Sequence, residues 1–107
     1  MANFKNDIEI AANNDPIDSF VIGPTERFSP TDRKIEQLPR GVILDWDKYK
    51  NYFDFQYDAG YGGVDVPAVY LWTNDYVLFV VEYDGSSWIS KVPRNPVECG
   101  PSTHGGG

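Results

Sequence analysis

Apolar and polar positions follow their clearest pattern in the last third of the chain. Three runs rich in β-branched and aromatic residues, 68–72, 76–83 and 87–92, are separated by Thr-Asn-Asp and Asp-Gly-Ser. Asp-Gly is a strong signal for a tight hairpin turn and Asn-Asp is a good one, because these residues tolerate positive φ. The pattern therefore predicts three antiparallel strands that follow one another as a meander.

The middle run, Tyr76–Tyr83, is apolar at both its odd and its even positions. Successive side chains of a strand point to opposite faces, so both faces of this strand are apolar. Such a strand is usually central in its sheet and covered on both sides. We therefore expect Leu71, Val77, Phe79 and Val81 to be buried, with short helices or an aromatic loop as the second cover.

The first 25 residues carry weaker patterns. Phe4, Ile8 and Ala12 recur at helical spacing, and a proline four residues later ends any helix. We expect residues 1–16 to form a short helix or a weakly ordered arm. The run Ile17–Gly23 has the composition of a first strand and closes with Gly-Pro.

Two segments between residues 29 and 53 predict short helices. In the first, Ser29 is a candidate N-cap followed by Pro30, which favours one or two helical turns. In the second, residues 42–44 suit a short strand. Asp45 or Asp47 then suits the cap of a helix that aligns three aromatic residues, Trp46, Tyr49 and Phe53.

These elements predict an α+β fold: a small antiparallel sheet covered by one or two short helices. The sheet is a meander of three C-terminal strands plus one or two N-terminal strands. A chain of 107 residues fits one domain, which we place at residues 17–96. Residues 97–107 are rich in Pro and Gly and predict a flexible tail, whose closing Gly-Gly-Gly is typical of a linker.

Charge is concentrated in the middle of the chain. The net charge is −7, and residues 41–84 hold eight acids against two lysines, a balance of −6. Most of the sixteen aromatic residues lie in the same stretch. An acidic balance argues against direct binding to nucleic acid or anionic lipid, where Lys and Arg must neutralise phosphates. It favours partners with positive surfaces.

Cysteine content and hydropathy indicate the compartment. Cys99 is the single cysteine, so no internal disulfide forms. The first residues show no basic start followed by an apolar run, and the longest apolar run, residues 76–81, is six residues long. We expect a cytoplasmic protein that does not bind membranes.

The sequence offers little for catalysis. Cys99 and His104 share the expected tail, which cannot hold a nucleophile and its base in a fixed geometry. Glu82, at the end of a predicted strand, is the best candidate for a perturbed carboxylate, but a glycosidase-like reaction needs a second acid and a cleft. We therefore expect no enzymatic activity.

The spacing of the residues also does not match known metal-binding or phosphate-binding motifs. A calcium loop starting at Asp45 would place Tyr49, Lys50 and Gln56 at positions that need an oxygen ligand, a glycine and a glutamate. The glycines of 60–63 lack the Lys-Ser/Thr of a phosphate loop, and nearby acids repel phosphate. We expect no metal and no other cofactor.

What remains is a surface. The aromatic residues outnumber the elements that can cover them, so we expect some to be exposed on or beside the Gly-rich loop of residues 54–67. Tyr and Trp are frequent interface anchors, and an acidic rim suits a partner's Arg, which stacks on rings and pairs with carboxylates. The predicted partner-binding residues are Asp54, Tyr57, Asp58, Tyr61, Asp65, Tyr70, Trp72 and Asp75.

We therefore expect a small acidic binding protein, a monomer or weak dimer, that inhibits a larger protein by occupying a basic, nucleic-acid-binding surface. In charge and size it resembles phage inhibitors of nucleases, including anti-CRISPR proteins, and immunity proteins that block nuclease toxins. Same-face carboxylates on a strand recur only every ~6.6 Å, against one charge per ~1.7 Å of duplex DNA, so mimicry needs several segments. The alternatives are a scaffold that self-associates, and a small carboxylate-dependent hydrolase.

Overall fold

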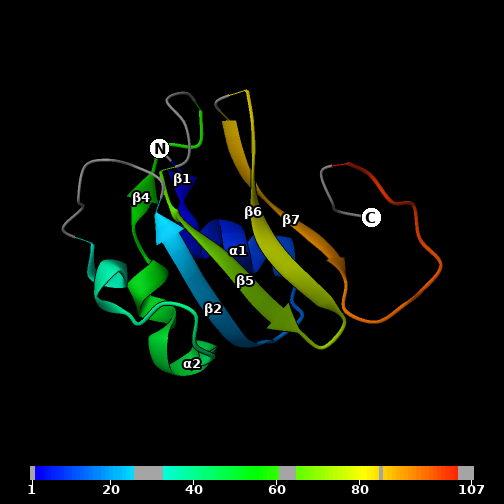
Figure 1. Ribbon diagram of the computed structural model, residues 1–107, viewed down its shortest axis with the longest axis horizontal. Coiled ribbons are helices and arrows are strands. Elements are labelled where there is room, and N and C mark those ends of the chain that lie inside the picture. Colours follow the sequence, from blue (N-terminus) through cyan, green and yellow to red (C-terminus); the bar gives the residue numbers. More distant parts are fainter. Residues whose placement is uncertain (1, 26–32, 61–64, 85, 104–107) are drawn as a thin grey trace.

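The computed structural model describes residues 2–25, 33–60, 65–84 and 86–103. These residues form the predicted α+β fold, in which short helices and a two-stranded sheet pack on one face of a five-stranded antiparallel sheet (Figure 1). The tail described up to residue 103 has no helix or strand after Pro93, and the expectations for His104 and the closing glycines lie outside the described residues.

The main sheet has the strand order β3-β2-β5-β6-β7. Its meander consists of β5 (Pro67–Thr73), β6 (Tyr76–Tyr83) and β7 (Ser86–Pro93), as the turn residues predict. β2 (Ile17–Thr25) pairs with β5, and the two-residue β3 (Leu44–Asp45) pairs with β2. The centre of the sheet is therefore β5, not the more apolar β6.

A second sheet joins β1 (Ala2–Asn3) to β4 (Gln56–Tyr57) and holds the start of the chain in place. The Phe4 N–H donates to the Phe55 carbonyl oxygen at 3.0 Å beside this pairing. These strands are not predictable from the sequence, because two residues are too few to show an alternating pattern.

Helix α1 (Phe4–Ala12) confirms the helical spacing at the start of the chain, since Phe4, Ile8 and Ala12 are all buried. The Asn3 side chain caps it by accepting the Asn6 N–H at 2.9 Å. Asn13 ends it in the left-handed region, with φ of 51°. In Figure 1, α1 lies behind β5 and β6, so that view looks onto the opposite face of the sheet.

The remaining helices are one turn each. Asp45 caps α2 (Trp46–Tyr49) by accepting the Lys48 N–H at 2.9 Å, which confirms one of the two predicted caps. The 3₁₀ helices η1 (Lys34–Gln37) and η2 (Lys50–Phe53) complete the layer. The predicted N-cap Ser29 and the Pro30 after it lie outside the described residues.

The core lies between this helical layer and one face of the main sheet. Phe20 of β2 meets Phe53 of η2 edge to face, with ring centroids 4.9 Å apart, and Phe4 meets Tyr57 at 5.4 Å. Leu71 and Leu78 complete the sheet side of the core. Much of the aromatic content between Trp46 and Tyr57 therefore serves the core.

The prediction of which face of β6 is buried is wrong. Val77, Phe79 and Val81 are only half-buried, whereas Leu78 on the other face is buried, as is Leu71. The helices and the β1–β4 sheet pack on the Leu78 side, and no described element covers the other side (Figure 1). Periodicity shows that both faces of a strand are apolar, but not how many layers the chain supplies.

No helix in the described part of the chain has the length and hydropathy needed to cross a membrane.

Candidate functional site: an uncovered aromatic sheet face

Strand register collects apolar side chains on the face of the main sheet that points away from α1. Directly opposed residues of antiparallel strands share a face. Tyr70 lies between Val21 and Phe79 in one such row, and Val81 lies opposite Trp88 in another. We call this surface the uncovered face; its members are Ser19, Val21, Ala68, Tyr70, Trp72, Val77, Phe79, Val81, Tyr83, Ser86, Trp88, Ser90 and Val92.

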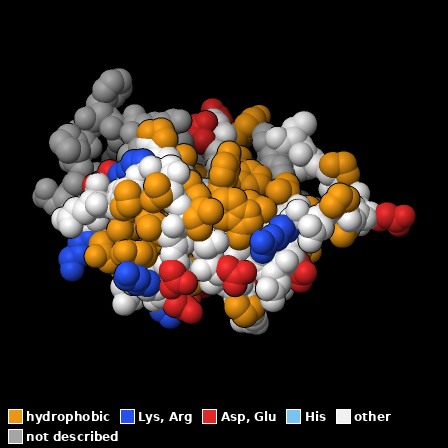
Figure 2. All heavy atoms as spheres, turned by 60° about the horizontal axis from the view of Figure 1, so that its bottom comes forward, with side chains coloured by type: hydrophobic (Ala, Val, Ile, Leu, Met, Phe, Trp, Pro, Cys, Tyr) orange, Lys and Arg blue, Asp and Glu red, His pale blue; other side chains and the backbone are white. Residues whose placement is uncertain are grey.

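None of these residues carries a charge. An antiparallel sheet with one solvated face normally places polar side chains there. Here Tyr70 is 59% exposed and Trp88 37% exposed, while Phe79 is half-buried by its neighbours. Contiguous apolar patches on the surface of a soluble protein mark interaction sites. In Figure 2, hydrophobic side chains gather over the middle of the view, with charged side chains below and beside them.

Two rings on β5 contact each other on the uncovered face. Tyr70 and Trp72 are two residues apart on one strand, so they point the same way, and their ring centroids are 6.3 Å apart at 80°. Trp72 is half-buried and Tyr70 stands out beside it. Rings that are fixed before binding lose little conformational freedom on binding, which suits an anchor.

Carboxylates gather at the end of the uncovered face where β5 turns into β6. The exposed Asp75 donates its N–H to an Asp15 carboxylate oxygen at 3.4 Å. Arg94 lies among these acids: its N–H donates to the Asp75 carbonyl at 2.8 Å, and its guanidinium lies 3.8 Å from Asp18. We call Asp15, Asp18 and Asp75 the acidic end.

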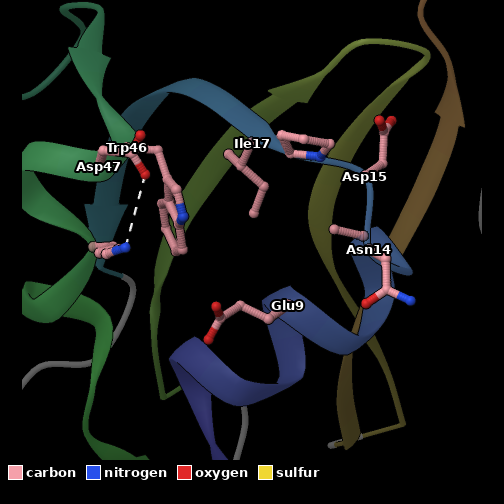
Figure 3. Close-up of a pocket in the computed structure, with 9 residues that line it drawn as sticks. Glu9, Asn14, Asp15, Ile17, Trp46 and Asp47 are labelled. Carbon is pink, nitrogen blue, oxygen red and sulfur yellow. Dashed lines mark ion pairs between the residues drawn. The ribbon is translucent and has the colours of Figure 1, made fainter.

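A polar hollow of about 280 Å³ adjoins the acidic end, between the end of α1 and α2 (Figure 3). Glu9, Asp15 and Asp47 contribute carboxylates to it, and Lys50 pairs with Asp47 at 3.8 Å. Glu9 and Asp47 are exposed to water, and Glu9 pairs with Lys5 at 3.2 Å, so lysines offset part of the negative charge around the hollow. Within the described ranges no group of three or more His, Cys, Asp or Glu side chains is arranged to hold a metal ion.

Tyr57, which the sequence placed on the binding surface, is a core residue. Its side chain is 1% exposed and its hydroxyl donates to Asp7 Oδ2 at 2.6 Å. Burial raises the pKa of Tyr57 well above its usual value, and the hydrogen bond and negative charge of Asp7 raise it further. Tyr57 therefore offers no ring to a partner.

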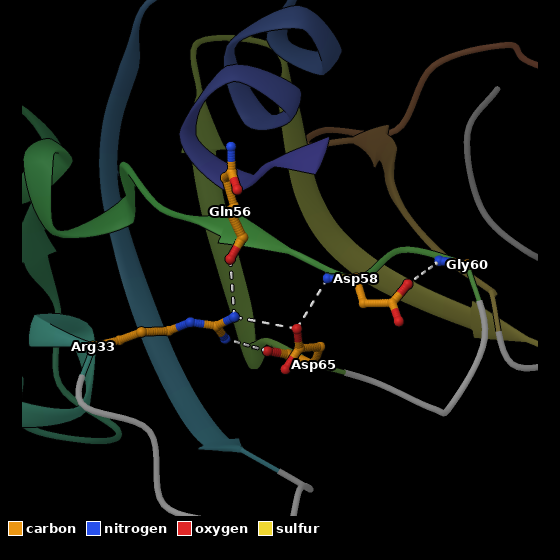
Figure 4. Close-up of polar contacts among 5 residues, drawn as sticks. All are labelled: Arg33, Gln56, Asp58, Gly60 and Asp65. Atoms are coloured by element: carbon orange, nitrogen blue, oxygen red, sulfur yellow. Dashed lines mark hydrogen bonds and ion pairs between the residues drawn. The ribbon is translucent and has the colours of Figure 1, made fainter. Parts of the chain in front are cut away.

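Asp65 is likewise not part of an exposed rim, because Arg33 pairs with it (Figure 4). Arg33 Nη2 lies 3.2 Å from Asp65 Oδ2, the same oxygen accepts the Asp58 N–H at 2.9 Å, and the Asp65 side chain is 5% exposed. The guanidinium also lies 4.3 Å from the centroid of the Phe55 ring. The stretch 57–85 contains no cation. The counterion of Asp65 is therefore a residue from outside this stretch, Arg33, which lies 32 positions earlier in the sequence.

The other two predicted acids lie near this ion pair. The half-buried Asp58 accepts the Gly60 N–H at 3.0 Å, which tightens the start of the loop, and the exposed Asp54 accepts the Asn3 side-chain N–H at 2.9 Å. Tyr61 lies outside the described residues. Of the predicted partner-binding residues, the structure therefore brings together Tyr70, Trp72 and Asp75, and it places Asp54, Tyr57, Asp58 and Asp65 around β4 instead.

Several members of the uncovered face were missed from the sequence. The sequence pattern predicts that Phe79 and Val81 lie in the core, and it does not mark Trp88 or Val92 as binding residues. The two hairpin turns fix the register of β5, β6 and β7, so they contain the information that these side chains share a face with Tyr70. They do not say which face the helices cover.

No protein-family model, curated protein or solved structure matches the chain.

Proposed function

We propose that this protein is a non-enzymatic inhibitor that docks its uncovered face against a larger protein, at a basic surface which that protein uses to bind nucleic acid. The observation that supports the proposal is an uncharged, aromatic-rich sheet face with carboxylates at one end. Apolar area supplies the driving force for association, and the carboxylates select a cationic partner.

Arginine is the partner residue that fits this arrangement best. A guanidinium stacks on a tyrosine or tryptophan ring and pairs with a carboxylate through fixed N–H groups. The Tyr70 ring is 59% exposed for stacking, and Asp75, five residues further along at the acidic end of the same face, is exposed for pairing with another cation. The whole molecule, at −7, is attracted to a basic surface and repelled by nucleic acid.

The mode of inhibition is occlusion rather than close mimicry of a duplex. The residues that would be buried carry no charge, so they cannot reproduce a row of phosphates. The carboxylates steer the encounter, and the rings fill the partner's groove in place of nucleic acid. Such a role suits a phage anti-defence inhibitor, including an anti-CRISPR protein, or an immunity protein against a nuclease toxin.

A competition assay tests the proposal. A nucleic-acid-binding protein captured from a host lysate is identified, purified and loaded with a fluorescent duplex, and this protein is then titrated in. We expect release of the duplex. Tyr70→Ala and Trp72→Ala should each raise the concentration needed by at least tenfold, as for central aromatic anchors.

The matched control is Ile10→Ala, which removes a hydrophobic side chain that is 66% exposed on α1, across the sheet from the uncovered face. It should leave the competition unchanged. Equal effects from Ile10→Ala and Tyr70→Ala, or capture with no release of the duplex, would overturn the proposal.

A second candidate function is self-association as a scaffold, and the same face favours it. Two uncharged sheet faces can pack about 10 Å apart in a two-fold arrangement. Added salt should have opposite effects on the strength of association in the two cases. Two copies that each carry −7 repel one another, so salt strengthens a dimer, whereas salt weakens the attraction to a basic partner.

A further inference from the structure

An apolar hollow of about 280 Å³ lies at the β2–β5 border of the uncovered face, beside Tyr70. The residues that shape it are Val21, Gly23, Pro24, Gly41, Ala68 and Tyr70. Val21, Ala68 and Tyr70 also belong to the uncovered face, so the hollow is continuous with the proposed docking surface.

The hollow exists because three of these residues have almost no side chain. Ala68 is exposed, and a Cβ atom built on Gly23 would lie 3.3 Å from its methyl group, which is a tight contact. Gly41 has φ of 73°, in the left-handed region where other residues are strained. Larger side chains at these positions would fill the space or distort the backbone.

The lining selects an uncharged ligand. No residue of the hollow carries a charge, and two carbonyl oxygens beside it already accept hydrogen bonds. The Ile22 oxygen accepts the Gly41 N–H at 2.9 Å, and the Gly23 oxygen accepts Arg40 Nη1 at 3.1 Å. Arg40 is itself paired with Glu36 at 2.6 Å. Because these two carbonyl groups are already paired, a polar ligand gains little from them.

We infer that this hollow binds an uncharged aromatic side chain of the docking partner. An apolar cavity of roughly 150 Å³ is large enough to bind benzene, so a hollow of about 280 Å³ has room for an indole or phenyl ring. The Tyr70 ring at its wall offers the edge-to-face contact that aromatic pairs favour. The inference rests on the proposed function and adds to it: the partner presents a ring close to its basic residues.

The first experiment needs no partner. The ¹⁵N-labelled full chain is titrated with indole, and guanidinium chloride at matched ionic strength serves as the cationic comparison. We expect saturable shifts of the Gly23, Gly41 and Ala68 amides with indole, at millimolar affinity, and none that saturate at these three positions with guanidinium. Absence of saturation with indole, or shifts centred on Phe79 and Val81 instead, would overturn the inference.

Variants of Ala68 then test the hollow itself. Ala68→Leu should weaken indole binding at least tenfold by filling the space, and the smaller Ala68→Val should have an intermediate effect. Asn6→Leu adds the same side chain to an exposed position on α1 and should leave indole binding unchanged. Circular dichroism confirms that each variant is folded. Unchanged indole binding in folded Ala68→Leu would contradict the assignment.

The two proposals fail in different ways. If indole does not bind but Tyr70→Ala still weakens duplex competition, the inference that the partner inserts an aromatic ring into the hollow is wrong, and the proposed docking face stands. If indole binds and Ala68→Leu does not alter duplex competition, the partner does not use the hollow and the inference falls. If indole binds and the captured protein never releases its duplex, the proposed function falls, and only the affinity of the hollow for an aromatic ring remains.

Discussion

At the residue scale, Tyr57 shows how a residue predicted to lie on the binding surface is instead buried in the core. Its ring packs on Phe4, and its hydroxyl spans from β4 to Asp7 on α1. Asp7 precedes Tyr57 by fifty positions in the sequence. The sequence marked Tyr57 by its acidic neighbours Asp54 and Asp58, whereas the residue that decides its burial is remote.

The raised pKa of Tyr57 leads to a pH dependence of stability. Unfolded tyrosine loses its proton near pH 10, while the folded protein keeps it to higher pH because of burial and Asp7. Above pH ~10 the unfolded state therefore binds fewer protons, and the free energy of unfolding falls as pH rises. This group contributes at most about 1.4 kcal/mol per pH unit to that fall.

Urea unfolding of the wild type and Tyr57→Phe between pH 8 and pH 11 measures this effect. At pH 8 the variant should be about 1 kcal/mol less stable, because it lacks the hydrogen bond to Asp7. Above pH 10 its stability should fall less steeply, so the two curves approach each other. Parallel curves throughout the range would show that Tyr57 does not hold its proton in the folded state.

At the element scale, Arg33 ties together two segments that flank the loop after β4. It donates to the Gln56 carbonyl at 3.0 Å and to the Asp65 carbonyl at 2.5 Å, in addition to its ion pair with the Asp65 carboxylate (Figure 4). Breaking a buried ion pair leaves an unpaired group in the interior. This contact therefore fixes where the loop starts and where β5 begins.

We expect Asp65→Ala to lower the free energy of unfolding by about 3 kcal/mol. The matched control is Glu36→Ala, which removes the acid of the more exposed Arg40 pair and should cost at most about 1 kcal/mol. Both are measured by urea unfolding at pH 7. Similar losses for the two variants would mean that burial of Asp65 adds nothing to its contact with Arg33.

Elements with a strong local pattern were predictable, and those set by remote contacts were not. The sequence signals for turns at Asn74-Asp75 and Asp84-Gly85 predict β5, β6 and β7, and the spacing of Phe4, Ile8 and Ala12 predicts α1. Because β1 and β4 form only through pairing with each other, neither has a signal of its own. In the candidate site, Tyr70, Trp72 and Asp75 are predictable because aromatic and acidic residues are concentrated in this part of the chain. Placing Phe79 and Trp88 on the same face requires the strand register and the position of α1.

At the scale of the whole molecule, the helices and the β1–β4 sheet all pack on one side, and the other side is an apolar sheet. The net charge of −7 opposes the association of two such faces. We therefore expect sedimentation velocity at 50 mM NaCl and micromolar concentration to show a monomer, and 500 mM NaCl to favour a dimer.

Trp72→Ser should reduce any dimer formed at 500 mM NaCl, because it removes a ring from the middle of the uncovered face. Ile10→Ala on α1 again serves as the control and should have no effect. A dimer that dissociates as salt rises would contradict packing through this face and point to an interface held by ion pairs.

The one-sided packing also affects how the stability of this protein should be measured. Dyes such as ANS become fluorescent on exposed apolar surface and are normally taken to report loss of tertiary structure. A native molecule that displays Tyr70, Trp72 and Phe79 on an open sheet already offers a place for such a dye. A dye-monitored melting curve would therefore start bright and underreport the transition, whereas far-ultraviolet circular dichroism would follow the strands directly.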